Sequence, residues 1–391
     1  MVLYHVVAGL GVSDTERQRG KPVFLLVGLY AGLGESAPAK VGRMERMKKE
    51  DLYTAAGWVD AARLIDCPEP FVIGLGGRGI GKSYGVLREL YERQIPFIYM
   101  RRTQTQIDAV SVQALNPYNQ ISADIGADIV TDKIGKQTVG FYNGVLNDKG
   151  VLVPDGEPFA LGIALSTFAT IRSLSAERYE VLLFDEIIPE RHERPIKEEG
   201  LAFSNVLESL NRNRELQDRR PLKVIMLTNS NTINSKIIEA VGCIDIIDNM
   251  TRTGQFYKSV DGLIAIFRYI DSPISKRKQD SAIYKVIKNS DFQNMALSNE
   301  FSRGDYENVS AKPINEYLPL CSFGNSTICK HKSKREYYCI AGVKAADRYE
   351  NLPLSRKAFN RKYWYVYGAM MDKKVFYQNA AVKIEIEGAF K

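Results

Sequence analysis

A glycine-rich segment places a lysine and a serine at the spacing that phosphate binding requires. In the run PFVIGLGGRGIGKS at residues 70–83, Gly76 is followed by four residues and then by Gly81, Lys82 and Ser83. This is the G-x-x-x-x-G-K-[ST] pattern of a phosphate loop. Glycines let the backbone turn tightly enough to direct successive N–H groups at a phosphate, and the helix that follows presents its positive end to the same anion. We therefore expect Lys82 to reach the β- and γ-phosphates of ATP and the Ser83 hydroxyl to hold Mg²⁺. A turn that only joined a strand to a helix would explain neither residue. The predicted nucleotide-binding residues of this segment are Gly76, Gly77, Arg78, Gly79, Ile80, Gly81, Lys82, Ser83 and Tyr84.

Two adjacent carboxylates follow a second apolar run, EVLLFDE, at residues 180–186. An unbroken apolar run is typical of a parallel strand that is buried on both faces, and ligands of such sheets bind at the carboxyl ends of the strands. We expect Asp185 to bind Mg²⁺ together with Ser83, and Glu186 to act as the general base that activates the attacking water. An apolar run followed by an acid also occurs at many strand ends. The position downstream of a phosphate loop favours the catalytic interpretation.

A third predicted strand, at residues 223–227, ends in Thr228, Asn229 and Ser230. Their amide and hydroxyl groups are expected at the same edge of the sheet, where they could sense the γ-phosphate. The alternative is turn chemistry that only closes a strand.

Strands alternate with helices between residues 71 and 270, which predicts an α/β domain with a mostly parallel sheet sandwiched by helices. We predict a motor domain at residues 44–275, a helical linker or lid at 276–312 and a small basic domain at 313–391. A helix is predicted at residues 45–64, and strands are predicted at 337–343, 363–370 and 374–378.

The charge of the chain is concentrated at its C-terminus. The 391 residues carry a net charge of +7, and residues 331–391 hold 13 Lys and Arg against 6 Asp and Glu, an excess equal to that of the whole chain. Aromatic residues are interleaved with these cations, which suits backbone neutralisation and base stacking on a nucleic acid. The alternative is a small domain with an aromatic core and solvated Lys and Arg.

Five cysteines occur at irregular spacing, which suits a reducing compartment. Cys321, Cys329, His331 and Cys339 lie close in sequence but include no C-x-x-C pair, so the pattern disfavours a zinc site.

Residues 1–43 combine a basic stretch, an apolar run at 23–33 and a small-residue Ala-Pro-Ala step, which is a weak match to a secretory signal. The apolar run is too short to span a membrane. Because Met44 and Met47 are natural alternative starts, we expect residues 1–43 to be an extension of unknown role that need not be native.

Four segments, in the same order, resemble the motifs of the ATPase domain of phage large terminases. They are GGRGIGKSYGVLRELYERQIPFIYMRRTQTQIDAVSVQAL at 76–115, RSLSAERYEVLLFDE at 172–186, KVIMLTNSNT at 223–232 and IAIFRYIDSP at 264–273. The chain is most similar to the compact DNA-packaging ATPases of small tailed phages with protein-primed genomes. The resemblance implies an ASCE-type P-loop NTPase that forms a ring, often of five subunits. Such a motor hydrolyses ATP to drive double-stranded DNA through a portal into a prohead in the host cytoplasm, in some cases with a structural RNA, and involves no membrane.

The resemblance also implies roles for arginines and for the third strand. Arg78 would act as a sensor within its own subunit, and Arg101 or Arg102 would lie near the adenine or couple the site to motion. Thr228 and Asn229 would couple hydrolysis to movement. An arginine finger from the neighbouring subunit completes such sites. The candidates for it are Arg212 and Arg214, with Arg172 behind them.

The C-terminal part departs from the full terminases, which carry an RNase-H-like nuclease that works through two metals. The run YYCIAGVKAAD resembles the first strand of that nuclease, but Lys344 stands where a metal-binding acid is expected. We therefore expect a degenerate nuclease-like domain that binds nucleic acid or the portal and cuts nothing.

Three other classes of function remain open at this point. The first is a helicase-like or AAA-type remodelling ATPase with a partner other than DNA. The second is a P-loop kinase of small molecules, which the tandem acids and the basic C-terminus disfavour. The third is a nucleotide-binding scaffold without activity, which is disfavoured because every catalytic part is present in the sequence.

Overall fold

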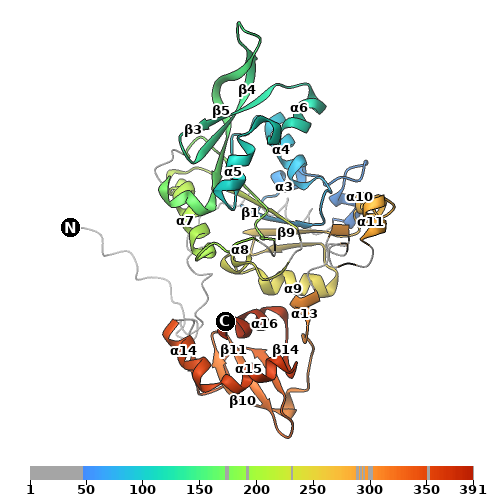
Figure 1. The fold of residues 1–391 in the computed structure, drawn as a ribbon, viewed down its shortest axis with the longest axis vertical. Helices are drawn as coiled ribbons and strands as arrows, with labels where there is room; N and C mark the ends of the chain where they lie inside the picture. Colours follow the sequence, from blue (N-terminus) through green and yellow to red (C-terminus); the bar gives the residue numbers. More distant parts are fainter. Residues whose placement is uncertain are drawn as a thin grey trace, which may run out of the picture.

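The computed structural model describes residues 47–390 apart from 172–175, 191–192, 230–231, 288–289, 291–292, 294–295, 298–302 and 350–352. The predicted extension at 1–43, Arg172 and Ser230 therefore lie outside the described residues. Two sheets organise the described chain, a nine-stranded sheet in the larger part and a five-stranded sheet near the C-terminus (Figure 1).

The larger sheet has the strand order β3-β4-β5-β2-β6-β7-β1-β9-β8. Its six inner strands, from β5 to β9 in that order, are parallel to one another, and antiparallel strands pair at both edges. Parallel strands end at a common edge, so the segments that follow β1, β6 and β7 meet there. The strands are β1 (Phe71–Gly76), β2 (Phe97–Arg101), β3 (Ile129–Ile134), β4 (Thr138–Leu146), β5 (Leu152–Ala164), β6 (Val181–Asp185), β7 (Lys223–Thr228), β8 (Tyr257–Val260) and β9 (Ile264–Tyr269).

Helices cover both faces of this sheet because alternate strand residues point to opposite sides. On β1, Ile73 and Leu75 pack on the side of α7, α8 and α9, whereas Val72 packs on the side of α3 to α6. The covering helices are α3 (Ala62–Asp66), α4 (Lys82–Glu92), α5 (Gln104–Val110), α6 (Asn119–Ile125), α7 (Glu199–Asn211), α8 (Lys236–Ala240) and α9 (Ile244–Thr253). The predicted fold class, a mostly parallel sheet between helices with a further sheet near the C-terminus, is confirmed.

The C-terminal sheet has the order β13-β10-β11-β12-β14, with the first three of its strands in the chain antiparallel and β13 and β14 parallel to their neighbours. Helix α16 bridges the two parts, since it packs against α9 and its Ala380 belongs to the core of the larger part. The elements are β10 (Tyr317–Phe323), β11 (Ser326–His331), β12 (Tyr337–Ala341), β13 (Arg348–Tyr349), α14 (Pro353–Lys362), α15 (Trp364–Met371), β14 (Val375–Tyr377) and α16 (Ala380–Ala389). Between the two sheets lie α10 (Pro273–Lys278), α11 (Ala282–Val286) and α13 (Arg303–Tyr306).

Two local predictions were wrong. The run at 363–370 is the helix α15 and not a strand, because Tyr363, Val366 and Ala369 are buried at helical spacing despite the strand propensity of the aromatic residues. The segment predicted as a helix at 45–64 contains a 3₁₀ turn, Lys49–Leu52, an isolated bridge between Tyr53 and Val59, and only then α3.

All five cysteines are buried free thiols. Cys329 packs on the opposite side of the C-terminal sheet from Cys321 and Cys339, since the two groups belong to different hydrophobic clusters. Within the described residues, no three His, Cys, Asp or Glu side chains gather as a metal site would require. None of the described helices is both long and apolar enough to cross a bilayer.

Candidate nucleotide site

The glycine-rich segment forms a tight loop between β1 and α4. Gly79 and Gly81 have φ angles of +62° and +90°, which side chains strongly disfavour. At Gly76 a Cβ atom would lie 2.8 Å from the Ile80 side chain, so this position also requires glycine. The loop borders a cavity of about 340 Å³. The lining residues are Arg78, Gly79, Gly81, Lys82, Ser83, Tyr84, Asp185, Glu186, Thr228 and Asn229.

Lys82 lies at the start of α4, and its ammonium is turned back into the loop. Its Nζ donates to the carbonyl oxygens of Gly76 and Gly77, at 2.9 and 2.7 Å, and to Oδ1 of Asn229 at 3.0 Å. Burial lowers the pKa of Lys82 to about 7, and the nearby carboxylates of Asp185 and Glu186 only partly oppose this effect. A buried ammonium bound only to neutral acceptors is poised to gain stabilisation from an anion.

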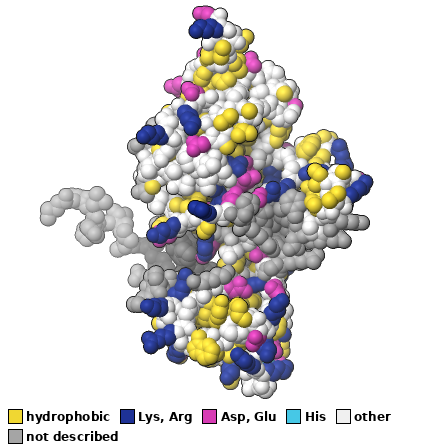
Figure 2. All heavy atoms as spheres, in the orientation of Figure 1, with side chains coloured by type: hydrophobic (Ala, Val, Ile, Leu, Met, Phe, Trp, Pro, Cys, Tyr) yellow, Lys and Arg dark blue, Asp and Glu magenta, His cyan; other side chains and the backbone are white. Residues whose placement is uncertain are grey.

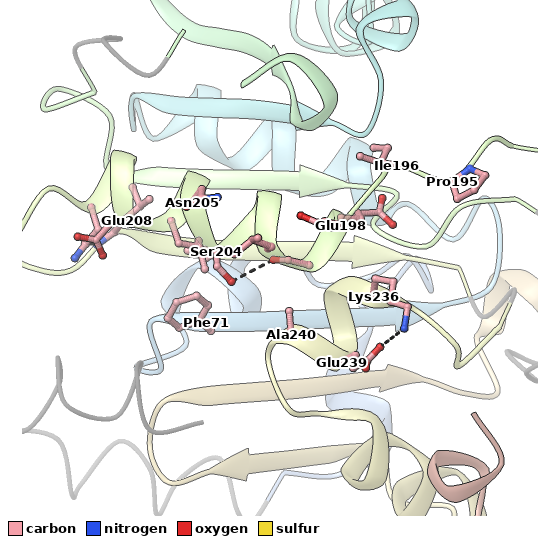
Figure 3. Close-up of a pocket in the computed structure, with 17 residues that line it drawn as sticks. Phe71, Pro195, Ile196, Glu198, Ser204, Asn205, Glu208, Lys236, Glu239 and Ala240 are labelled. Carbon is pink, nitrogen blue, oxygen red and sulfur yellow. Dashed lines mark hydrogen bonds and ion pairs between the residues drawn. The ribbon is translucent and has the colours of Figure 1, made fainter. Parts of the chain in front are cut away.

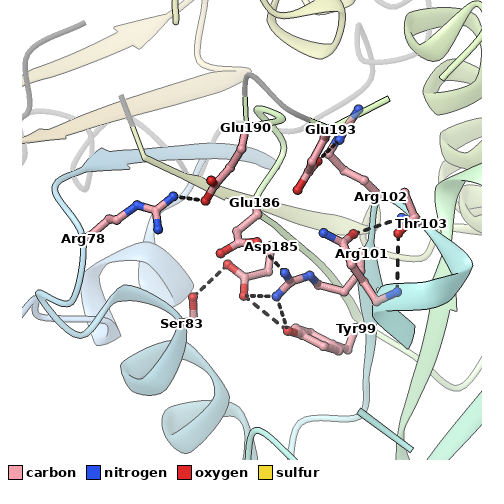
Figure 4. A network of polar contacts seen from close by, with 11 residues as sticks. Arg78, Ser83, Tyr99, Arg101, Arg102, Thr103, Asp185, Glu186, Glu190 and Glu193 are labelled. Atoms are coloured by element: carbon pink, nitrogen blue, oxygen red, sulfur yellow. Dashed lines mark hydrogen bonds and ion pairs between the residues drawn. The ribbon is translucent and has the colours of Figure 1, made fainter. Parts of the chain in front are cut away.

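Ser83 and Asp185 lie side by side although about 100 residues separate them in sequence. The Ser83 hydroxyl donates to Oδ1 of Asp185 at 2.8 Å, because the start of α4 and the end of β6 meet at one sheet edge (Figure 4). The Tyr99 hydroxyl donates to Oδ2 of Asp185 at 3.3 Å. Asp185 is only 4% exposed. A hydroxyl and a carboxylate are the hard oxygen donors that Mg²⁺ prefers, so the residues present fit this ion.

Glu186 occupies the first position after β6 with a φ of +59°, in the left-handed region. Non-glycine residues held in this region cost free energy and are frequent at functional sites. Burial raises the pKa of Glu186, with Asp185 acting in the same direction and Arg101 opposing it. A carboxylate whose pKa is raised towards the working pH is better suited to accept a proton from water.

Arg101 at the end of β2 joins both carboxylates (Figure 4). One guanidinium nitrogen donates to Oδ2 of Asp185 at 3.4 Å and to the Tyr99 hydroxyl at 3.1 Å, and the other donates to Glu186. Arg101 thus fixes the orientation of Glu186 and lies beside both carboxylates. Its position supports a coupling role and gives no support to adenine contact.

Arg102 points away from the cavity. It is 1% exposed and forms ion pairs with Glu193 and with Glu199, the latter at 2.7 Å. These contacts tie the end of β2 to the segment after β6 and to the first turn of α7. Arg102 was predicted to contact the nucleotide or to couple the site to motion, but its side chain does not line this cavity.

Arg78 and Tyr84 line the cavity and are also held by other residues. The Arg78 guanidinium pairs with Glu190, and its carbonyl oxygen accepts a hydrogen bond from Lys278 at 2.7 Å. The Tyr84 hydroxyl donates to Asp124. Thr228 and Asn229 reach the cavity from the end of β7, where Asn229 accepts the bond from Lys82.

The structure does not bring the two candidate arginine fingers to this cavity. Both follow α7 at the edge of the sheet where β7 begins, which is the edge opposite to the phosphate loop. Arg214 is 4% exposed and donates to the carbonyl oxygens of Ala176 and Tyr179, at 3.0 and 2.5 Å. This buried engagement is structural and does not suit an arginine finger. Arg212 is half-buried, and its Nε donates to the carbonyl oxygen of Ser209 at 3.2 Å.

Three residues of the site escaped the sequence analysis, namely Tyr99, Glu190 and Lys278. Tyr99 precedes the Arg-Arg pair by two positions and could have been found from strand alternation, which puts it on the same face as Arg101. Glu190 and Lys278 approach the loop from separate segments, and no local spacing signals them.

A phosphate loop at the end of a parallel strand, beside a strand-end Asp-Glu pair in a mostly parallel sheet, defines an α/β ATPase of the P-loop class. Residues 47–328 match the model of the podovirus DNA encapsidation protein (Gp16) family, and the chain belongs to this family. The predicted resemblance to the compact phage packaging ATPases is confirmed.

Two solved structures share the fold. The phi-28 gp11 DNA packaging motor superposes with a TM-score of 0.57 at 17% identity, covering 86% of this chain and 99% of that one. The bacteriophage phi-29 viral genome packaging motor assembly gives a TM-score of 0.58 at 16% identity, covering 85% and 99%. The search of curated proteins gave no match.

Proposed function

We propose that this protein is an ATP-driven translocase that packages double-stranded DNA into a viral prohead through its portal. The observation that carries the proposal is the convergence of Lys82, Ser83, Asp185 and Glu186 on one cavity in a chain of the DNA encapsidation family. The two similar structures are DNA packaging motors, which supports a ring assembly, and we expect five subunits. The expected setting is the host cytoplasm, transiently on the prohead, and a structural RNA is a further candidate partner.

The side chains of the cavity have separate roles in this proposal. Lys82 and the N–H groups of the loop bind the β- and γ-phosphates, and Ser83 and Asp185 hold Mg²⁺, which supplies charge neutralisation when bound. Glu186 accepts the proton of the attacking water, and Arg101 orients Glu186. Arg78 contacts the γ-phosphate from within the subunit. Asn229 exchanges its bond to Lys82 for one to the nucleotide and so reports its presence to the end of β7.

Arg212 is our candidate for the arginine finger, supplied to the cavity of a neighbouring subunit. It lies at the edge of the sheet opposite to its own phosphate loop, so it can serve a site only in another copy of the chain. Removal of such a finger lowers the hydrolysis rate by about 10³-fold or more.

We propose a division of the chain into a motor domain at 44–275, a linker or lid at 276–312 and a nucleic-acid-binding domain at 313–391 without nuclease activity. Two acids of the last domain are engaged with separate partners, which supports the absence of cleavage. Asp347 pairs with Lys362 and accepts from Tyr363, whereas Glu385 accepts from Asn325 and Ser326. Mg²⁺-dependent cleavage of DNA by the purified protein, lost on changing one of these acids, would contradict this part.

ATPase assays test the main proposal. The wild-type protein should hydrolyse ATP faster in the presence of double-stranded DNA or proheads, and Lys82→Ala and Glu186→Gln should both abolish the reaction. Glu186→Gln should still bind nucleotide, because Lys82 and Ser83 are intact. Hydrolysis that is indifferent to duplex DNA would favour a remodelling ATPase with another partner.

A further inference from the structure

The strands β4 and β5 extend beyond the rest of the sheet as a two-stranded arm, residues 143–155. The pairing continues from Asn143 with Asp155 to Leu146 with Leu152, whereas β3 pairs with β4 only as far as Asn143. Neither strand of the arm has a further neighbour among the described residues, and the arm projects away from α7 and α8 (Figure 1, top). The outer part of a free two-stranded ribbon is only marginally stable in water, so an arm of this kind gains from being covered.

The arm ends in a hydrogen-bonded turn that exposed apolar side chains flank. The side chain of Asn147 accepts from the N–H groups of Lys149 and Val151, both at 3.0 Å, and Gly150 takes a φ of +70° to complete the turn. Around this turn Val145, Leu146 and Val151 are 48%, 64% and 56% exposed. In Figure 2 hydrophobic atoms lie at this end of the molecule, directly behind the charged side chains of its tip. Exposed apolar side chains concentrated on a projection are typical of a surface that docks on another protein.

A cleft of about 1020 Å³ lies elsewhere on the same chain, between α7 and α8 over the starts of β1 and β7 (Figure 3). Its apolar lining includes Phe71, Ile196, Leu201 and Ala240, and Leu201 is 59% exposed. Carboxylates surround this lining. They are Glu198, Glu199, Glu208 and Glu239, and Lys236 is the cation among the described lining residues.

The chemistry of both features excludes a nucleic acid. The acidic cleft would repel phosphates. The turn of the arm carries one anion and one cation, Asp148 and Lys149, so it has no net positive charge that would attract a polyanion. A convex apolar projection and a concave apolar cleft at separate places on one chain can form the two halves of a head-to-tail contact. Such a contact closes into a ring when the rotation between copies allows it.

We infer that the arm of one subunit seats in the cleft between α7 and α8 of the next subunit. This inference rests on the ring assembly in the proposed function, and names the contact that builds it. The cleft wall includes Glu199, which accepts from Nε of Arg102 at 2.7 Å, and Arg102 follows directly on Arg101. An arm seated in the cleft therefore contacts α7, which Arg102 ties to the end of β2 next to Asp185 and Glu186. This contact links the occupancy of one nucleotide site to the neighbouring subunit.

Cysteine cross-linking tests the contact directly, because all five native cysteines are buried. The double variant Leu146→Cys with Leu201→Cys is assembled on proheads with DNA and a slowly hydrolysed ATP analogue, and then oxidised. We expect a ladder of covalent oligomers up to the full ring, while each single variant gives none. A double variant that cross-links no further than the single variants overturns the inference.

A charge variant separates this inference from the proposed function. Leu146→Lys with Val151→Lys should leave basal hydrolysis by the isolated subunit unchanged, prevent ring assembly in analytical ultracentrifugation, and lower DNA-stimulated hydrolysis at least tenfold. Ile134→Lys, at an apolar position on β3 that is 43% exposed, is the control outside the arm and should behave as the wild type. Normal rings from the arm variant would overturn the inference. A cross-linked ladder in a protein without DNA-stimulated hydrolysis would overturn the proposed function and leave the contact standing.

Another occupant of the cleft would also be detected. Hydrogen exchange of α7 should be protected only at concentrations at which the protein assembles. Protection that persists in the monomer and disappears on removal of residues 1–43 would assign the cleft to that segment and overturn the inference.

Discussion

The protonation of Lys82 should make nucleotide binding take up a proton. Burial among neutral acceptors lowers the pKa of Lys82 to about 7, whereas a triphosphate beside the ammonium would restore its charge. At pH 8 the free protein would carry Lys82 mostly neutral, so each binding event should absorb about 0.9 proton. Between pH 7 and pH 9 the affinity for the nucleotide should fall about 50-fold, or about 2.3 kcal/mol, because Lys82 must take up a proton before it can pair with the phosphates.

Isothermal titration calorimetry measures this uptake. Binding of a non-hydrolysable ATP analogue at pH 8, in buffers of different ionisation enthalpy, gives the number of protons from the slope of the observed heat. Lys82→Arg keeps its charge at every pH used and should remove the uptake, while titration of the nucleotide itself remains in both proteins. Lys278→Arg is the second control, because Lys278 contacts the same loop and burial also lowers its pKa. A wild-type slope equal to that of Lys82→Arg would refute the reasoning.

The same pKa fixes the sign of a stability effect. The folded protein binds fewer protons at Lys82 than the unfolded chain between about pH 7 and the ordinary lysine value of 10.5. The contribution of Lys82 to the free energy of unfolding therefore rises with pH across this window.

Three further substitutions test the site and its support. Arg101→Gln should move the acid limb of the pH profile of kcat to higher pH, because Arg101 opposes the rise of the Glu186 pKa. It should also lower kcat at pH 7 by roughly 10- to 100-fold, and an acid limb at the wild-type pH would contradict this reasoning. Gly79→Ala should weaken nucleotide binding at least tenfold in fluorescence titration, since the φ of +62° is strained for alanine and its Cβ would lie 2.6 Å from the Lys278 ammonium. Unchanged affinity would show that the loop tolerates the strain and the close contact. Arg214→Met should lower the free energy of unfolding by about 1–3 kcal/mol in urea titrations, because it removes the hydrogen bonds that Arg214 donates to the carbonyl oxygens of Ala176 and Tyr179. The exposed Arg220→Met should change it little, and equal effects would argue against the structural role.

Much of the site follows from local sequence. The spacing from Gly76 to Ser83 predicts the loop, because the glycines, the lysine and the start of α4 are neighbours along the chain. The apolar run before Asp185 predicts a buried strand, and strand order makes its end meet the loop. The run at 363–370 shows the limit of this reasoning, since aromatic residues favour a strand locally and burial at helical spacing decides for a helix.

The sequence by itself determined which chemical groups the cavity contains and the α/β class of the sheet, since both depend on neighbours in the chain and on the period of apolar residues. Only the tertiary structure decided that Arg101 binds Asp185 and Glu186, whereas Arg102 pairs with Glu199 of α7. It also decided that Arg214 donates to backbone carbonyls. It alone revealed an apolar arm and a separate apolar cleft on one chain. The physical reason is that charge pairing and burial depend on which distant segments pack together, and these contacts leave no spacing in the sequence.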